Sequence, residues 1–213
     1  MGSDCRVGIV VGLAAEARIA RRLGWHVAIG GGTAAGAERA ARSLLDSGAT
    51  AFVSVGLAGG LDPSLRPGDL VIPEWVLCRG TRYRADAALS QRLGGTTPHL
   101  LLGGDALVAS AADKQRLWRE TGAAAVDLES GAVARTAAES GVPFAVLRAV
   151  CDPAERALPR AASIGLDSQG AIAFWRTLAS LIAKPRQLPV MLRLATDAVV
   201  ARRALLARLS AQA

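Results

Sequence analysis

The chain has 213 residues, 51% of them hydrophobic and 4% aromatic, a balance that favours one folded domain with a core of small aliphatic side chains and excludes a disordered chain. Its net charge of +7 is concentrated near the C-terminus, because residues 184–213 hold six basic residues and one acidic residue and so carry +5. The remaining +2 is too small for a general nucleic-acid-binding surface.

The cysteines indicate neither a disulfide framework nor a metal site. Cys5, Cys78 and Cys151 are odd in number and lack metal-ligand spacing, so we expect reduced thiols, no metal and a cytoplasmic protein. The chain also lacks a run of about 18 apolar residues and a basic region followed by an apolar one. We therefore expect it to be neither exported nor membrane-spanning.

The first predicted elements are a buried strand over residues 7–12 and a helix over residues 13–23. Glu16 falls in the first turn of this helix, where the helix dipole alone would favour a carboxylate. A second strand over residues 25–29 leads through three glycines into an alanine-rich helix over residues 33–45.

The three glycines at this turn are candidates for binding a phosphate group. Glycines before a helix N-terminus let backbone N–H groups approach an anion, which makes Gly31, Gly32 and Thr33 the candidate phosphate-binding residues. A dinucleotide site is disfavoured, because GGGTAAG is not GxGxxG and no acid follows about 20 residues later. A plain loop explains the glycines equally well.

The middle of the chain combines a buried strand with glycine-rich and basic segments. A strand over residues 51–55 is followed by GLAGGLDPSLRPGDLVIP, which we interpret as a glycine-rich turn and loop. Residues 74–95 carry Arg79, Arg82 and Arg84, predicted as a solvated basic loop or as arginines that reach a phosphate. A strand over residues 100–102 precedes GGDALVASAADKQRL, which enters a further helix.

Acidic residues cluster around two later strands. A short strand delivers Asp127 and Glu129 before a helix, and an apolar strand over residues 144–150 delivers Asp152. Open α/β sheets place ligands at such strand ends, so the pattern predicts acid chemistry on a small polar ligand. The alternative is that Glu129 and Asp152 only cap the helix and the loop that follow them.

The last segments are predicted to be helices over residues 168–183 and 188–209. The second has an apolar side, predicted to comprise Met191, Leu194, Ala195, Ala198, Leu205 and Leu209. Arg202 lies near this side and would have to extend its guanidinium to water. The helix is expected to dock on the core or on a second subunit, or alternatively to lie on anionic lipid.

Four blocks in order resemble one protein family. GIVVGLAAEA, GLAGGLDPSLRPGDLVIP, GGDALVASAADKQRL, and VDLESGAVA followed by VPFAVLRAVCDPA are similar to motifs of the purine nucleoside phosphorylase and methylthioadenosine/adenosylhomocysteine nucleosidase superfamily. The resemblance implies an α/β domain over residues 6–183, with a central mixed twisted β-sheet flanked by helices. Residues 184–213 would form a basic, amphipathic helical extension.

The resemblance also implies roles for individual residues. Asp152 would be the general acid that protonates the purine, Glu16 would position or deprotonate the attacking water, and Glu129 would bind the ribose hydroxyls. Leu107 replaces an aromatic residue that stacks on the purine in the family, and Leu57 replaces a serine. The remaining implied substrate-binding residues are Leu128, Asp127, Val108, Leu107 and Gly59.

The motifs look most like the hopanoid-associated phosphorylase branch, which implies release of adenine from adenosylhopane in hopanoid biosynthesis. The nucleophile is left open between water and phosphate, and no cofactor is expected other than phosphate as a possible co-substrate. A homo-oligomer and peripheral membrane contact through the last helix are implied. The alternatives are a methylthioadenosine/adenosylhomocysteine nucleosidase and a non-catalytic nucleoside- or lipid-binding protein on this fold.

Overall fold

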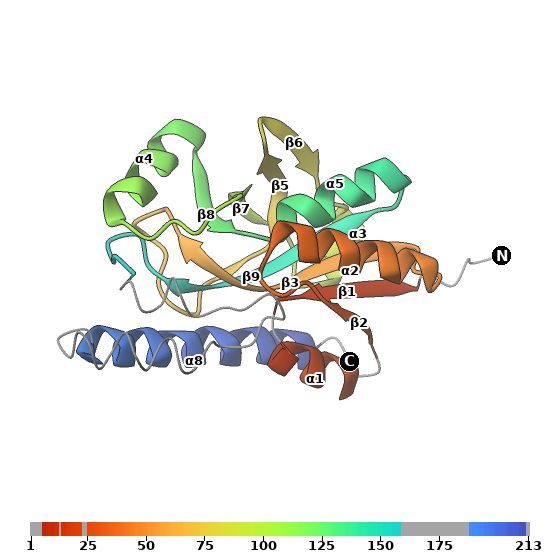
Figure 1. Ribbon diagram of the computed structural model, residues 1–213, viewed down its shortest axis with the longest axis horizontal. Helices are drawn as coiled ribbons and strands as arrows, with labels where there is room; N and C mark the ends of the chain where they lie inside the picture. The colour runs from red at the N-terminus through yellow and green to blue at the C-terminus, as the bar shows by residue number, and fades with distance from the viewer. Residues whose placement is uncertain (1–5, 13, 23–24, 159–187, 212–213) are drawn as a thin grey trace.

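A computed structural model describes residues 6–12, 14–22, 25–158 and 188–211, which form a β-sheet between helices (Figure 1). The strands are β1 (Val7–Val11), β2 (His26–Ile29), β3 (Ala51–Gly60), β4 (Leu70–Val71), β5 (Pro73–Cys78), β6 (Thr81–Arg84), β7 (Thr97–Gly103), β8 (Ala123–Asp127) and β9 (Phe144–Asp152). The helices are α1 (Ala14–Arg22), α2 (Ala34–Asp46), α3 (Ala87–Arg92), α4 (Ala111–Thr121), α5 (Ser130–Ser140) and α8 (Leu188–Ser210).

The strands form one mixed sheet in the order β2-β1-β3-β8-β7-β5-β6, with β9 paired to β3 and β4. Most of β3 runs parallel to both β1 and β9, whereas its last two residues pair antiparallel with β8. Gly59 is the branch point, because it lies opposite Asp152 of β9 and also opposite Val126 of β8. The branch therefore brings the carboxyl ends of β8 and β9 to the same part of the sheet.

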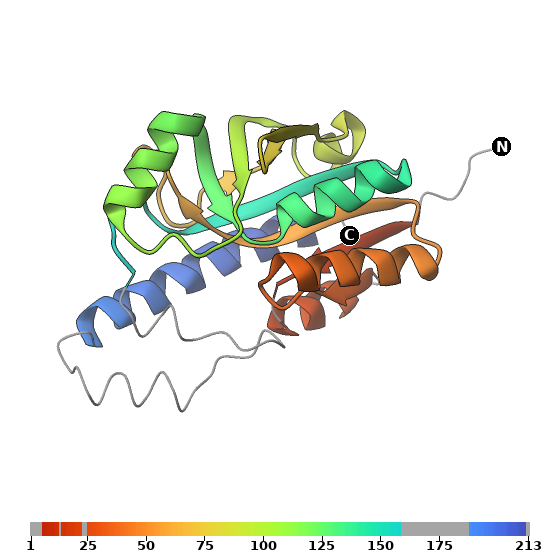
Figure 2. The same cartoon turned by 45° about the horizontal axis from the view of Figure 1, so that its top comes forward.

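Helices cover both faces of the sheet and enclose two apolar cores. Alanines of α2 and α5 pack with Phe52, Val146 and Val150 on one face. On the other face, side chains from α1, α3 and α8 pack with alternate residues of β1, β3 and β9. Figure 2 shows the blue helix α8 running beneath the cyan strand β9 on this face. Because alternate residues of a strand point to opposite faces and both faces are covered, β1, β3 and β9 are apolar along most of their length. The predicted mixed sheet flanked by helices, with a C-terminal helix, is confirmed.

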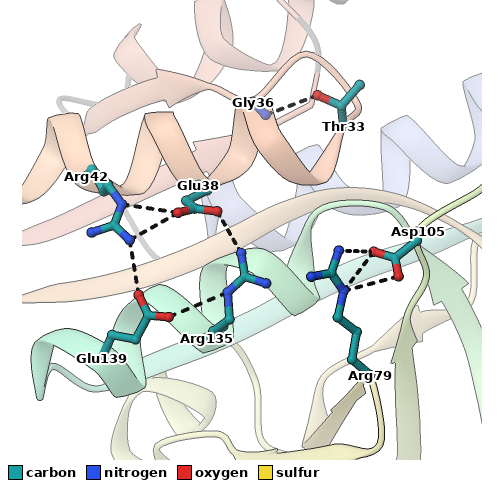
Figure 3. A network of polar contacts seen from close by, with 8 residues as sticks. All are labelled: Thr33, Gly36, Glu38, Arg42, Arg79, Asp105, Arg135 and Glu139. Atoms are coloured by element: carbon teal, nitrogen blue, oxygen red, sulfur yellow. Dashed lines mark hydrogen bonds and ion pairs between the residues drawn. The ribbon is translucent and has the colours of Figure 1, made fainter.

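Surface ion pairs join α2 to α5 above the first core (Figure 3). Arg135 lies 2.6 Å from Glu38, and Arg42 lies 3.1 Å from Glu139. Thr33 caps α2, since its hydroxyl oxygen accepts a 3.1 Å hydrogen bond from the N–H of Gly36. Exposed ion pairs add little stability, so the buried alanine face holds these helices together.

The predicted basic loop over residues 74–95 is wrong, because β5 and β6 form a hairpin there. Arg79 and Gly80 make its turn with φ values of 49° and 79°, the left-handed conformation that two-residue hairpin turns require. Arg79 pairs with Asp105 on the loop after β7, as Figure 3 shows, and Arg84 pairs with Glu74. These two arginines are held by surface acids rather than by the buried carboxylates.

The glycine-rich turn predicted from residue 56 is also corrected. Gly56, Gly59 and Gly60 continue β3 in extended conformation, and the chain turns only after Gly60. Backbone pairing outweighs the conformational freedom of glycine here, since Gly56 and Gly59 have partners in β9 and Gly60 has a partner in β8. The glycines instead allow other groups to approach the strand closely.

Helix α8 lies along the sheet face opposite α2 and α5 (Figure 1). Ala201, Leu205 and Leu209 are buried in the second core, so docking on the core is observed for this half of the helix. Ala195, predicted on the apolar side, is exposed. The predicted helix over residues 168–183 and the predicted boundary between residues 183 and 184 lie outside the described residues.

Candidate active site

Charged side chains are buried where β1, β8 and β9 end. Each has an exposed fraction of 7% or less, which is rare for charged residues unless they are paired or functional. They are Glu16, Lys114, Asp127, Glu129, Arg148 and Asp152.

Glu129 sits in a cradle made by two glycines and a backbone N–H group. Its Oε1 accepts a 3.1 Å hydrogen bond from the N–H of Gly32. A Cβ atom built on Gly12 would lie 2.9 Å from Oε2, and one built on Gly30 would overlap Oε1. The carboxylate therefore occupies space that exists because β1 and β2 are each followed directly by a glycine.

The environment of Glu129 favours its protonated form. Burial, opposed by the positive charge of Arg148, raises its pKa to about 7, and the nearby carboxylates of Asp127 and Glu16 act in the same direction as burial. Glu129 therefore changes its charge near neutral pH, a property that clusters at functional sites.

Arg148, in the middle of β9, connects two of these acids. Its Nη2 lies 2.5 Å from Oδ2 of Asp127, and its Nη1 lies 3.7 Å from Oε2 of Glu129. Nη2 also donates hydrogen bonds to the hydroxyls of Ser54 at 2.6 Å and Ser130 at 2.9 Å. The guanidinium is thus bound firmly at Asp127 and only loosely at Glu129, which leaves Glu129 more available to a ligand.

Glu16 lies close to Gly56 of β3, on the same side of the strand as Arg148. A Cβ atom on Gly56 would collide with the Arg148 guanidinium and would lie 3.9 Å from Oε2 of Glu16. Glu16 is buried in the first turn of α1, and its charge acts on Glu129. Glu16, Glu129 and Arg148 therefore form one cluster beside a strand that carries no side chain at this point.

Asp152 is the last residue of β9 and has a different partner. Its Oδ2 accepts a short hydrogen bond from Nζ of Lys114, a fully buried residue of α4. Oδ1 has no hydrogen-bond partner in the described part of the chain, so it is the oxygen left to meet a ligand. Along β9, Asp152 lies four residues, roughly 13 Å, from Arg148.

Burial raises the pKa of Asp152, whereas the hydrogen bond and charge of Lys114 oppose that rise. Asp152 is thus a carboxyl group that retains its proton more readily than an exposed aspartate. The neighbouring Cys151 is even less inclined to ionise, because burial raises its pKa to about 12. A thiolate nucleophile at this position is therefore excluded at neutral pH.

The hydrogen bonds at the start of α5 test the alternative that the acids are only capping residues. Glu129 holds the N-cap position of α5 but makes no capping hydrogen bond with its side chain. Asp127 performs that task, because its Oδ2 accepts a 3.0 Å hydrogen bond from the N–H of Ser130. Capping and the ion pair with Arg148 account for Asp127 structurally, but they do not account for Glu129 or Asp152.

The candidate phosphate-binding residues are already engaged. Gly31 and Gly32 have positive φ values of 72° and 70° and form the predicted turn, yet the Gly32 N–H donates to Glu129. Thr33 caps α2 with its hydroxyl oxygen. A phosphate here would have to displace a carboxylate from its amide donor.

The remaining predicted residues surround the sheet end. Leu107 is 48% exposed on the loop after β7, and Leu128 is half-buried between Asp127 and Glu129. Val108 is half-buried against a small apolar cluster of Leu61, Ala123 and Val126. A Cβ atom on Gly59 would lie 3.9 Å from Oδ2 of Asp152, so this glycine is next to the acid.

The buried cations Arg148 and Lys114 were not predicted as site residues, although the sequence around each indicates that it is buried. Arg148 interrupts an otherwise apolar strand, and a buried arginine requires acidic partners. Lys114 precedes Leu117 and Trp118 by three and four residues, which places a cation on the apolar face of α4. No group of three or more His, Cys, Asp or Glu side chains that could hold a metal occurs in the ranges described.

A hollow of about 700 Å³ on the surface lies away from these charges. It is lined by residues of the β5–β6 hairpin and the start of β9, including Trp75, Tyr83 and Phe144. Phe144 and Asp152 are the two ends of the nine-residue β9. The hollow is therefore not part of the candidate active site.

Known proteins resemble part of this chain in sequence. A 5′-methylthioadenosine/S-adenosylhomocysteine nucleosidase of Geobacillus kaustophilus is 34% identical over 140 residues, which cover 51% of this chain and 58% of that protein. One from Mycobacterium bovis is 28% identical over 152 residues, 49% of this chain and 60% of that protein. The chain thus spans less than two thirds of the length of these curated relatives.

Solved structures resemble the fold over nearly the whole chain. A Helicobacter pylori nucleosidase variant with 5′-methylthioadenosine in its active site matches with a TM-score of 0.68 and 18% identity, covering 99% of both chains. The futalosine hydrolase of Helicobacter pylori has the same TM-score and identity and covers 97% of both chains. The family model described as Phosphorylase superfamily matches residues 24–182, so the chain belongs to the phosphorylase superfamily.

Proposed function

We propose that this protein hydrolyses the N-glycosidic bond of a purine nucleoside and releases the free base. The observation that carries the proposal is the division of the buried acids into two groups at one sheet end. Asp152, whose Oδ1 has no hydrogen-bond partner among the described residues, lies at one side, and Glu16 and Glu129 lie beside Arg148 at the other. A nucleoside requires an acid at its base and negative charge at its sugar, and this division supplies both.

At the base, the protonated form of Asp152 would act as a general acid. As the glycosidic C–N bond breaks, its electron pair moves onto the purine, and the Asp152 proton passes to a purine ring nitrogen. Burial raises the pKa of Asp152 and so favours the protonated form that this step requires. General acid catalysis of this kind typically contributes about 10² to 10⁴ in rate.

At the sugar, ionised Glu129 would accept hydrogen bonds from the ribose hydroxyls and stabilise the positive charge that develops at the anomeric carbon. A water molecule would then form the new C–O bond and transfer its proton to Glu16. Arg148, bound mainly to Asp127, would keep Glu129 in place without neutralising it fully. Solvent exchange would return a proton to Asp152 and remove one from Glu16.

The geometry favours water over phosphate as the nucleophile. The Gly32 N–H, which could bind an anion, already donates a hydrogen bond to Glu129. Glu16 is a second carboxylate close to Glu129. A phosphate dianion beside two carboxylates would be repelled unless they were protonated. We therefore propose hydrolysis and treat phosphorolysis as the competing outcome.

For the substrate, we propose adenosylhopane, with the adenine leaving. The proposal rests on the resemblance of the sequence blocks to the hopanoid-associated branch and on the exposed Leu107, which offers an aliphatic surface where an aromatic residue would stack. The alternative substrates are methylthioadenosine and adenosylhomocysteine, which the names of the sequence relatives favour.

Contact with a membrane surface and assembly into a homo-oligomer remain proposals. The exposed apolar residues Leu192, Val199 and Val200 of α8 support such a contact, together with the exposed Arg193 and Arg203. The face of α8 that packs on the sheet is not available for it. No helix in the described ranges has the length and apolar character needed to cross a bilayer.

The test is the release of adenine from adenosylhopane in detergent, with methylthioadenosine and adenosylhomocysteine as parallel substrates. Higher kcat/KM with adenosylhopane is expected. Release from the thio-nucleosides alone would overturn the hopanoid substrate while keeping the nucleosidase. Absence of base release from any purine nucleoside would overturn the proposed function itself.

A further inference from the structure

We propose that Lys114 is a positioning residue for Asp152: it fixes the aspartate with one oxygen toward the substrate and stabilises the carboxylate that remains after the proton has left. This inference rests on the proposed function, because it assigns a partner to the proposed general acid. Lys114 does not touch the purine in this account, and it acts only through Asp152.

The geometry around the Lys114 ammonium is complete. Its Nζ donates hydrogen bonds to Oδ2 of Asp152, to the carbonyl oxygen of Pro153 at 3.0 Å and to that of Arg156 at 3.0 Å. Three donors meet three acceptors, so the ammonium has no hydrogen left for a ligand. Its task is therefore internal to the protein.

This arrangement orients the acid. Because Oδ2 is bound to Lys114, rotation of the carboxyl group would break a buried hydrogen bond, and Oδ1 remains the oxygen without a partner in the described ranges. The acceptor loop is held in turn, since the N–H of Leu158 donates to Ala109 just before α4. The guanidinium of Arg156 also pairs with Asp197 on α8. Contacts among α4, the loop after β9 and α8 thus hold Lys114 and its acceptors in position.

The charge of Lys114 decides how strong an acid Asp152 can be. A buried carboxyl group with no cation nearby keeps its proton and is a poor donor, whereas an adjacent ammonium stabilises its ionised form. When Asp152 gives its proton to the departing purine, the new negative charge faces Lys114 at hydrogen-bond distance. Lys114 therefore lowers the barrier by stabilising the Asp152 carboxylate that the proton transfer produces.

Other charged groups face the same carboxyl group. Arg156, on the loop after β9, opposes the rise in the pKa of Asp152, and Asp197 of α8 contributes to it. Cys151 adds no charge at neutral pH, because its pKa is about 12. Lys114 is the cation in direct contact, so its removal should dominate the response.

The experiment compares Lys114→Met, Lys114→Arg and the control Arg116→Met, which removes an exposed cation from the same helix. Asp152 must be protonated to act, so activity is lost as pH rises through its pKa. Removing the ammonium raises that pKa, which moves the alkaline limb of the kcat/KM profile to higher pH. We expect a shift of about one pH unit or more and a fall in kcat of about tenfold or more.

The arginine variant and the control separate positioning from general structure. Lys114→Arg should keep the alkaline limb within a few tenths of a unit, and Arg116→Met should leave kcat and the profile unchanged. Lys114→Met with lower activity at every pH but an unmoved limb would overturn the inference. Asp152→Asn in the same assay separates the two proposals: if it stays active, the proposed acid fails, and if it is inactive while Lys114→Met resembles wild type, only the role of Lys114 fails.

Discussion

The backbone N–H of Gly32 donates a 3.1 Å hydrogen bond to Oε1 of Glu129, across 97 positions of sequence. This contact places a carboxylate on the glycine turn that could otherwise bind phosphate. We therefore predict that base release proceeds at the same rate in phosphate-free buffer and in phosphate. The products should be the free base and a sugar with a hydroxyl at the anomeric carbon. Release that requires phosphate and yields a sugar phosphate would contradict hydrolysis.

The raised pKa of Glu129 predicts the acid side of the pH profile. Glu129 must be ionised to stabilise the positive sugar, and its pKa is about 7. The kcat/KM values should therefore fall as pH drops below about 7, and Glu129→Gln should have low activity with no such limb. A wild-type acid limb near pH 4.5, the ordinary range of a glutamate, would show that burial does not act on Glu129 as described.

The same pKa has a consequence for stability. Because the folded-state pKa is above the ordinary glutamate value of 4.5, the folded protein binds the proton more tightly than the unfolded chain, and stability falls as pH rises from about 4.5 to 7. Glu129→Gln removes this loss. The difference in unfolding free energy between Glu129→Gln and wild type, measured by urea denaturation, should therefore change with pH. We expect it to favour the variant more at pH 8 than at pH 5, by roughly 2 kcal/mol. Equal differences at both pH values would contradict this.

Arg148 should matter more for folding than any surface arginine. Arg148→Met leaves the buried Asp127 without its cation, and breaking a buried pair on one side typically costs about 3–5 kcal/mol. Arg42→Met is the matched control, because Arg42 pairs with Glu38 and Glu139 at the exposed surface (Figure 3). Urea denaturation should show a large loss for the first and a small one for the second. Similar losses would mean that the buried pair is not needed for folding.

Gly56 should not tolerate even a methyl group. An alanine Cβ there would overlap the Arg148 guanidinium, whereas one at Gly59 would have contacts of 3.6 Å or more. Gly56→Ala is therefore expected to lower stability by about 1–3 kcal/mol, the usual effect of overpacking, and Gly59→Ala to fold with stability close to wild type. The thermal midpoints of the two variants check this, and a Gly56→Ala protein as stable as Gly59→Ala would contradict the close packing of Arg148.

Much of the fold could be predicted from the sequence because its signals are local. The apolar runs at residues 7–12 and 144–150 become β1 and β9, and Thr33 begins α2 as its cap. The end of β3 could not be predicted in this way, since glycines favour turns locally while β9 supplies a long-range backbone partner. The β5–β6 hairpin was likewise hidden by its arginines, which lie on a solvent-exposed edge.

The candidate site was only partly predictable for a related reason. Glu16, Glu129 and Asp152 could be selected because each lies at or shortly after the end of a recognisable strand, within a block that resembles a family motif. The roles of Lys114 and Arg148 depend on which acids the fold brings to them. Asp152 is 38 residues from Lys114 in the sequence, and Asp127 is 21 residues from Arg148. Lys114 in particular looks like an ordinary helix cation until α4 is placed against the end of β9.

The measurement that tests the central claim most directly is the amount of free purine base formed by wild type and by Asp152→Asn, side by side in phosphate-free buffer. Asp113→Asn, which changes an exposed aspartate of α4, serves as the control. We expect base release by wild type and the control and a loss of about 10² or more in kcat for Asp152→Asn, with unchanged folding by circular dichroism. Full activity of the folded Asp152→Asn protein would contradict it.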